Sequence, residues 1–176
     1  MHIGELNMAA TCQLKIYTGA SAATETPAAD AANWNMMLSD AYNANSTMYQ
    51  TYPITVDTNA TAYSFERWMK LKFTGTFNKI ENVKAYKSAG SLSDAALAIN
   101  AGETATGATP TASASTKATA AIPTASGSAI DITPVAGISS SGDKTDFLVA
   151  QLSVPTTVTT PGDIGSQTLT FTYDES

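Results

Sequence analysis

Few side chains in this 176-residue sequence are of the types that usually perform chemistry. The only histidine is His2 and the only cysteine is Cys12. A Ser-His-Asp triad, a Cys-His pair and a histidine-ligated metal site therefore all lack a base or a ligand. The sequence also has no P-loop and no Gly-x-Gly-x-x-Gly motif. We expect no catalytic residue, no cofactor, no metal and no enzyme activity.

Carboxylates are plentiful, with 15 Asp and Glu residues. A two-carboxylate hydrolase needs only one pair of them, but most fall in turns or on polar strand faces. Glu66 is better placed to pair with a neighbouring lysine. Calcium takes about six to eight oxygen ligands, and Ser141, Asp143 and Asp146 share one turn. That turn offers fewer ligands and no EF-hand spacing, so we interpret it as a solvated turn.

Aromatic side chains offer a first route to binding. From Tyr63 to Phe73 the odd-numbered residues are mostly apolar and the even-numbered ones mostly polar, which is the period of a β-strand. Trp68 interrupts the polar row. If exposed, Trp68 and Tyr86 would stack on a sugar ring, as in a carbohydrate-binding module. We favour the alternative that Trp68 lies under a loop or against a neighbouring subunit, or that a bulge at Arg67 reverses the register.

Lysine side chains offer a second route to binding. Residues 61–90 carry six bases and two acids, although the whole chain has a net charge of -6 and a pI near 4.5. The acidic chain argues against a nucleic-acid partner, which requires a strongly basic surface. The candidate positive face consists of Lys70, Lys72, Lys84 and Lys87. It is either the solvated face of two strands or a contact surface for a partner.

A third candidate contact surface lies earlier in the chain, in a segment that contains Trp34, Met36, Met37, Met48 and Tyr49. These side chains either cap one end of the fold or form an apolar surface for a partner. The surrounding Asn, Ser and Asp residues are poor helix formers. We therefore expect a loop with at most one helical turn over residues 30–42.

The elements that position these residues are short strands. Alternation and turn signals predict strands at 12–17, 63–73, 80–87, 97–99, 118–122, 130–132, 147–154 and 169–173. Gly75 and Asn78 supply turn conformations, so we interpret the strands at 63–73 and 80–87 as a central hairpin. Pro53 cannot donate to a sheet, which makes residues 52–56 an edge strand or an extended arm. Cys12 fits as a small core residue.

The predicted fold class is all-β. It is a single antiparallel β-sandwich, Ig-like or jelly-roll-like, with about seven to eight strands and long irregular loops. Residues 1–176 form one domain, in which 1–11 are an extended N-terminal arm and 103–129 a low-complexity surface excursion. In residues 103–128, 19 of 26 residues are Ala, Ser or Thr. This composition buries little apolar area.

The N-terminal segment MHIGELNMAA lacks the basic start and apolar stretch of a secretory signal. No run of about 18 apolar residues is present that would span a membrane. We therefore expect a protein that is made in a cytoplasm and, if it acts outside a cell, leaves by another route such as release within a particle.

The segments YSFERWMKLKFTGTFNKIENVKAYKSAG, IPTASGSAI and TDFLVAQLSVPTTVTTPGDIGSQTLTFTYDES resemble small β-sandwich structural proteins of tailed bacteriophages. The resemblance covers about residues 50–176 and includes no active residues. It implies a non-enzymatic virion component, specifically a capsid decoration or auxiliary head protein bound to the major capsid protein in many copies. A tail or fibre component and a homo-oligomer are compatible with it. The rival is the sugar-binding module.

Overall fold

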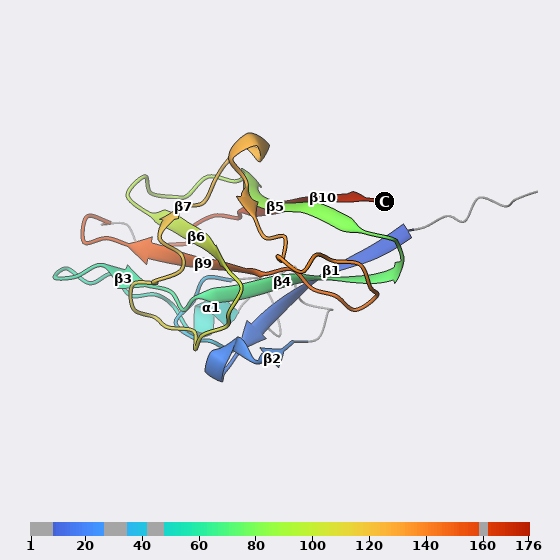
Figure 1. Cartoon of the computed structure of the whole chain (residues 1–176). Helices are drawn as coiled ribbons and strands as arrows, with labels where there is room; N and C mark the ends of the chain where they lie inside the picture. The colour runs from blue at the N-terminus through green and yellow to red at the C-terminus, as the bar shows by residue number, and fades with distance from the viewer. Residues whose placement is uncertain (1–8, 27–34, 42–47, 159–161) are drawn as a thin grey trace, which may run out of the picture.

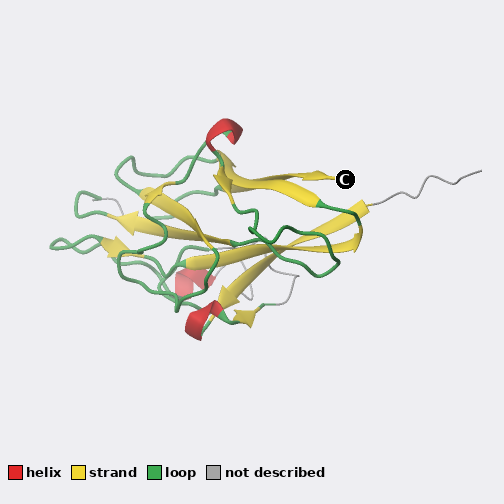
Figure 2. Cartoon of the chain, viewed as in Figure 1, coloured by secondary structure: helices red, strands yellow, loops and turns green. Residues whose placement is uncertain are grey.

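A computed structural model of the chain describes residues 9–26, 35–41, 48–158 and 162–176 (Figure 1). These residues contain ten strands, one four-residue α-helix and short 3-10 turns. All strand pairs are antiparallel, and the strands form two sheets (Figure 2). The predicted all-β antiparallel sandwich is confirmed.

The larger sheet has seven strands in the order β2-β1-β4-β9-β6-β7, with β3 also paired to β9. Its strands are β1 (Ala9–Thr18), β2 (Thr24–Glu25), β3 (Ala62–Tyr63), β4 (Arg67–Thr76), β6 (Ala98–Thr104), β7 (Ala120–Ala121) and β9 (Phe147–Val154). The smaller sheet has the order β10-β5-β8, with β5 at Ile80–Ala89, β8 at Ile130–Asp131 and β10 at Thr168–Glu175. The helical turns are η1 (Ala20–Ala22), α1 (Met48–Thr51) and η3 (Ser126–Ser128).

The six long strands follow the strand order of an immunoglobulin-like sandwich. In that fold one sheet has the order A-B-E-D and the other C-F-G. Here β1-β4-β9-β6 takes the first order, and β5-β10 takes the positions of C and F. The described residues contain no strand at the position of G, beside β10. The topology therefore favours the Ig-like alternative over a jelly roll.

The main core lies between the two sheets. The apolar row of β4 supplies Met69, Leu71 and Phe73, and β5 supplies Val83 and Ala85 from the opposite sheet; all five are at most 2% exposed. Full burial of a side chain as large as Leu or Phe is worth about 1.5–3 kcal/mol. The alternation that predicted this row from the sequence thus identifies the side of β4 that stabilises the sandwich.

A second, smaller apolar cluster covers part of the outer face of the large sheet. It contains Tyr17, Ala22, Trp68, Ala118, Phe147 and Val149. The Phe147 ring makes edge-to-face contacts with both Trp68 and Tyr17, with 5.2 Å between ring centroids in each pair. Because β9 lies between β4 and β6 and contributes to both clusters, it is buried on both faces, as its continuous apolar sequence predicted.

The predicted central hairpin is wrong. The strands β4 and β5 are consecutive but belong to different sheets: β4 pairs with β1 and β9, and β5 pairs with β10 and β8. The short link between Thr76 and Ile80 is therefore a corner that carries the chain from one sheet to the other. The predicted start of the strand at Tyr63 is also interrupted, because β3 and β4 are separated by Ser64, Phe65 and Glu66.

The low-complexity excursion is attached to the large sheet by buried polar side chains of β9 and of the link between β3 and β4. Gln151 is 2% exposed, and its Nε2 donates to the carbonyl oxygens of Ser64 (2.9 Å) and Ser113 (2.8 Å). Its Oε1 accepts from the Ser115 amide at 2.9 Å. Glu66 was expected beside a lysine. Its carboxylate instead accepts from the Trp68 indole at 2.9 Å and from the excursion's backbone.

Close backbone contacts hold the excursion at two further points. A Cβ added at Gly102 would lie 2.1 Å from the Lys117 carbonyl oxygen, and one at Gly107 would lie 2.2 Å from that of Ser21. The excursion is thus closely packed on the outer face of the larger sheet. Its composition alone did not predict this packing.

Several other expectations concern the N-terminal half. Residues 9–11, predicted as part of an extended arm, begin β1; residues 1–8 lie outside the described residues. Residues 35–41 contain no helix, in agreement with the expected loop, and residues 30–34 and 42 lie outside the described residues. No strand forms at residues 52–56, which leaves the extended arm. None of the helices in the described ranges is long and apolar enough to cross a bilayer.

Candidate functional site

The four lysines predicted as one positive face do not share a face. Lys70 and Lys72 lie in the outer row of β4, opposite to Leu71 in the core. Lys84 alternates with the core residues of β5 and so points outward from the smaller sheet, on the other side of the sandwich. The Lys87 ammonium group donates to the Gly90 carbonyl oxygen at 2.5 Å and to Gln167 Oε1 at 3.1 Å. The predicted face is thus corrected to two separate surfaces.

Two of the apolar contact candidates are removed from the surface. Met37 and Trp68 are both 0% exposed, so neither can contact a partner in this conformation. Trp68 is covered by Phe147 and by the excursion, which is the loop-covered alternative considered from the sequence. Trp34 lies outside the described residues, and of Tyr49 only the helical backbone of α1 is described.

The outer face of β1 and β4 carries four lysines, of which only Lys70 and Lys72 belong to the predicted positive face. We define the lysine cluster as Lys15, Lys70, Lys72 and Lys144. The strand register places Lys15 directly opposite Lys70, and an isolated bridge places Lys72 opposite Lys144. Like charges directly opposite each other destabilise a sheet. These two pairs therefore require a counter-charge.

Glu25 of β2 supplies that counter-charge. One carboxylate oxygen lies 3.6 Å from the Lys15 ammonium nitrogen and 3.9 Å from that of Lys72. The other accepts a hydrogen bond from Lys144 and one from the Tyr17 hydroxyl at 2.9 Å. The hydrogen bond from Lys144, followed by that from Tyr17, outweighs partial burial and lowers the pKa of Glu25 to about 2. The carboxylate therefore stays ionised across the neutral and mildly acidic range.

Two lysines of the cluster also make cation–π contacts with aromatic rings. The Lys70 ammonium nitrogen lies 4.0 Å from the centroid of the Phe147 ring, and that of Lys144 lies 5.6 Å from the Tyr17 ring. A cation over an aromatic face is worth about 0.5–2 kcal/mol. Burial lowers the pKa of Lys70, although the Asp146 carboxylate opposes that shift. The side chains of Lys72 and Lys144 remain about one-third exposed, at 31% and 34%.

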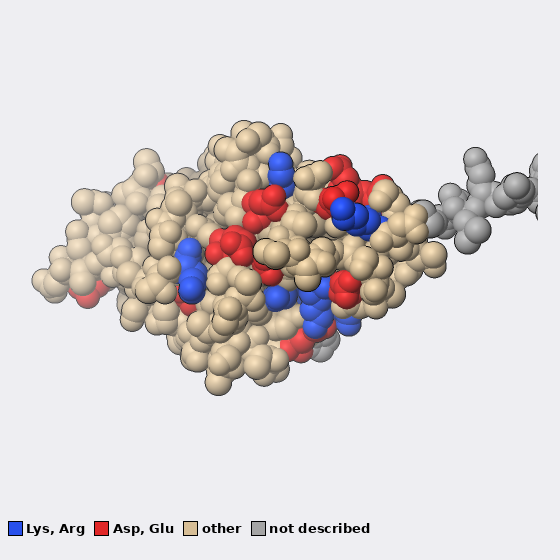
Figure 3. Space-filling model, viewed as in Figure 1, with Lys and Arg blue, Asp and Glu red and all other residues tan. Residues whose placement is uncertain are grey.

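The lysine cluster is a fixed cationic surface. Figure 3 shows Lys and Arg side chains gathered over β1 and β4, with acidic side chains at their margin. Their ammonium groups are held by a sheet and by Glu25, so binding an anionic surface would require little ordering of long side chains. The evident chemical capacity of this arrangement is electrostatic contact.

Sequence reasoning found two of the four lysines. Lys15 could have been added, because it alternates with Leu14 and Ile16 in a strand that was predicted correctly. Glu25 and Lys144 could not, since their contact joins residues 119 positions apart and depends on the tertiary fold.

A buried arginine lies near the Trp68 cluster. Arg67 is 2% exposed, its Nε donates to the Asn35 carbonyl oxygen at 2.8 Å, and burial lowers its pKa to about 10. Its Nη2 is a buried donor without a hydrogen-bond partner, and Asp40 Oδ1 is a buried acceptor in the same state. The other oxygen of Asp40 accepts from the Gly19 amide at 2.6 Å. These contacts tie the 35–41 segment to β1 and β4.

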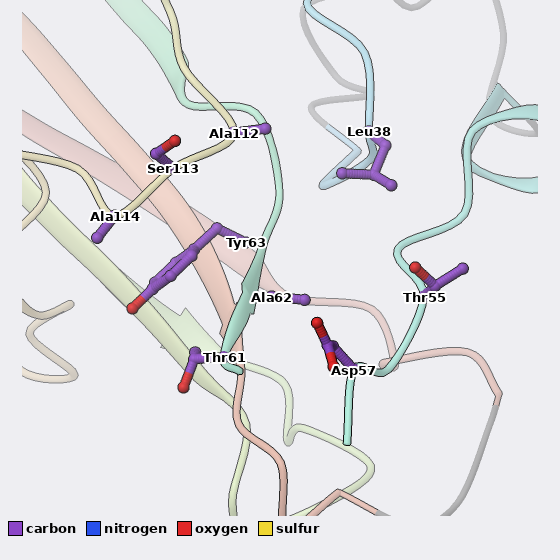
Figure 4. A pocket seen from close by; sticks show the side chains of 9 residues that line it. All are labelled: Leu38, Thr55, Asp57, Thr61, Ala62, Tyr63, Ala112, Ser113 and Ala114. Carbon is purple, nitrogen blue, oxygen red and sulfur yellow. The ribbon is translucent and has the colours of Figure 1, made fainter. Parts of the chain in front are cut away.

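A shallow hollow of about 430 Å³ lies at the end of the sandwich that contains β3 (Figure 4). Its lining residues are Leu38, Thr55, Asp57, Thr61, Ala62, Tyr63, Ala112, Ser113 and Ala114. The Tyr63 ring points toward Thr61 and Ala114 and away from Asp57 and Leu38 (Figure 4). The ring is therefore not presented to the hollow as a stacking platform for a sugar.

The turn that contains Ser141, Asp143 and Asp146, considered above for calcium, is held by hydrogen bonds within the protein. Asp143 Oδ2 accepts hydrogen bonds from the backbone amides of Ser139 (3.0 Å) and Ser140 (2.9 Å), and Ser141 Oγ accepts from the Gly75 amide at 3.2 Å. These bonds fix the turn against the end of β4. Within the described ranges, no group of three or more His, Cys, Asp or Glu residues is placed to hold a metal ion.

Together, the fold and this surface describe an antiparallel β-sandwich with an Ig-like strand order and the lysine cluster on its larger sheet. Comparisons with family models, with curated proteins and with solved structures found no match to this chain.

Proposed function

We propose that this chain is a non-enzymatic bacteriophage virion protein, and specifically a capsid decoration protein that binds the outer shell in many copies. The proposal combines the resemblance of residues 50–176 to small phage structural proteins with the character of the lysine cluster. On a shell with many identical sites, modest contacts repeated many times give high occupancy.

The lysine cluster carries the proposal. Its charges lie on a rigid sheet of a chain whose net charge is -6, so the surface is electrostatically distinct from the rest of the molecule. A local positive surface favours an acidic partner surface and steers its approach. Since the exteriors of phage capsids are often acidic, the shell is the partner that this surface fits best.

Particles of the encoding phage provide the first test. We expect the chain in a copy number proportional to that of the major capsid protein, measured by quantitative mass spectrometry, and its density on the outer shell by electron cryomicroscopy. Only a few copies per particle, located at the tail, would instead support the tail or fibre alternative.

Charge removal provides the second test. In binding to particles stripped of the protein, Lys70→Gln/Lys72→Gln should lower occupancy. The matched control is Lys79→Gln/Lys84→Gln, which removes the same charge from β5 and the link that precedes it, outside the lysine cluster. Equal binding by both variants would contradict a role for the lysine cluster.

The sugar-binding alternative is weakened by the burial of Trp68. It now depends on Tyr86, which is half-buried on the smaller sheet. Specific binding on a glycan array that is lost in Tyr86→Ala would favour this alternative over the structural role.

A further inference from the structure

The edge of β10 is the longest unpaired edge of the smaller sheet. All eight residues of β10 belong to a regular strand that pairs with β5 on one side. On its other side no described residue forms a strand pair with it. This is the side that strand G covers in an immunoglobulin sandwich. The edge therefore presents backbone donors and acceptors to a further strand.

The side chains of β10 that face the core are also incompletely buried. Leu169, Phe171 and Tyr173 pack against the main core but remain only partly buried, whereas the core residues of central β9 are almost completely buried. The Tyr173 ring makes an edge-to-face contact with Phe73, at 5.0 Å between centroids. An added strand beside β10 would cover the exposed side of this row.

The features that normally protect an edge strand are missing from most of β10. Such edges usually carry lysine, proline or a bulge, but the sequence from Thr168 to Tyr173 contains neither lysine nor proline. The two register irregularities of the β10 and β5 pair place their extra residues in β5, so β10 itself stays regular. Its acidic residues, Asp174 and Glu175, stand only at its end.

We propose that β10 pairs with β10 of a second copy of this chain, antiparallel and about a two-fold axis that passes between the two Phe171 residues. The two small sheets then form one continuous sheet across the dimer. This interface is separate from the lysine cluster, and it holds whether or not the chain attaches to a virion.

The proposed register is self-complementary. Phe171 faces its own copy, Leu169 faces Tyr173, and Thr170 faces Thr172. Aromatic, aliphatic and Thr-Thr pairs of this kind stabilise neighbouring strands. Asp174 faces Thr168, so no like charges meet. A shift of one residue is excluded, because it would place the inner row of one copy beside the outer row of the other.

Two neighbouring registers also preserve the faces, and both are less favourable. The one centred on Thr170 pairs only residues 168–172 of each strand, and the other is centred on Thr172. It would set the Glu175 carboxylate opposite Leu169. Glu175 already accepts a hydrogen bond from the Ala10 amide at 2.9 Å within its own chain. In the register centred on Phe171, the last paired residue is Asp174. Glu175 lies beyond it and keeps its hydrogen bond to the Ala10 amide.

Sedimentation of the full chain tests the association. We expect a dimer for the native chain and a monomer for Thr170→Lys/Thr172→Lys, because the register places these lysines opposite each other. Thr156→Lys/Thr157→Lys adds the same charge at exposed turn positions and should remain dimeric. Circular dichroism checks that both variants are folded. A monomeric native chain would overturn the proposal.

Cysteine cross-linking tests the register without disrupting the edge. In a Cys12→Ser background, Thr170→Cys protein is mixed with Thr172→Cys protein and oxidised. Directly opposite residues have Cβ atoms about 4.5–5.5 Å apart, close to disulfide geometry. We expect a disulfide-linked dimer mainly in the mixture and little in either variant alone. Equal cross-linking in the separate variants, or none in the mixture, would overturn the proposed pairing.

Discussion

At the residue scale, the arrangement around Glu25 shows how the fold tolerates neighbouring positive charges. Two pairs of lysines face each other across neighbouring strands, and a single carboxylate contacts three of the four ammonium groups. Lys70, the fourth, is placed over the Phe147 ring. Glu25 thus stabilises three of the lysines by its charge, and the Phe147 ring stabilises the fourth by a cation–π contact.

Replacing Glu25 with Gln should destabilise the protein at neutral pH by about 1.5–3 kcal/mol, the range for hydrogen bonds to a charged group. The folded-state pKa of about 2 lies below the ordinary value of 4.5. The stabilisation from the carboxylate is therefore fully present above pH 4.5 and is lost as the pH falls through about 2. Urea unfolding of both proteins at several pH values measures the difference.

The expected signature is a difference in unfolding free energy that is largest near neutral pH and vanishes near pH 2. Glu81→Gln is the control, because Glu81 pairs with Lys79 on an exposed part of the surface. An exposed ion pair contributes about 0–1 kcal/mol. A loss of the same size for both variants would contradict the central role of Glu25.

At the element scale, side-chain alternation predicted the strands well and their partners poorly. The predicted strands at 147–154 and 169–173 correspond to β9 and β10, because period two reports which residues face the core. The turn signals Gly75 and Asn78 show only that the chain changes direction. They do not distinguish a hairpin from a corner between sheets, a choice that depends on β1 and β9, which are distant in sequence.

The fit between β6 and the excursion gives a second prediction. Gly102→Ala would bring a Cβ to 2.1 Å from the Lys117 carbonyl oxygen, a backbone atom that can move only with its whole segment. Overpacking of this kind costs about 1–3 kcal/mol. We expect a lower melting temperature and faster hydrogen exchange over residues 111–119.

Gly127→Ala is the matched control, because nothing lies within 4 Å of a Cβ at that position. Its stability should stay within about 0.5 kcal/mol of the native protein, as for most surface substitutions. An equal loss of stability in the two variants would contradict close packing of the excursion against β6.

At the scale of the whole molecule, the excursion turns a two-sheet sandwich into a partly three-layered one (Figure 1). Its composition predicted only that it buries little apolar area. The sequence could not predict that Gln151 and Glu66 bond its backbone, since these contacts span 36 to 45 positions. Of the lysine cluster, Lys70 and Lys72 were found because both lie in one strand with clear alternation.

Attachment through the lysine cluster predicts a strong dependence on salt. Raising the ionic strength from about 0.1 M to about 1 M shortens the Debye length from about 10 Å to about 3 Å. The occupancy of stripped particles by the native protein should therefore fall over this range in a co-sedimentation assay. Lys70→Gln/Lys72→Gln should bind weakly and with a shallower salt dependence. Salt-independent binding of the native protein would point to an apolar contact instead.

The way Gln151 and Glu66 hold the excursion has a consequence for how this chain can evolve. Both residues recognise main-chain atoms, which every amino acid offers, so most positions of the covering segment can exchange their small side chains while its path is kept. Gly107 and the buried Ala118 are exceptions. Gln151 and Glu66 themselves have no such freedom. We therefore expect related sequences to differ most within residues 103–129, while the backbone path of this segment stays the same.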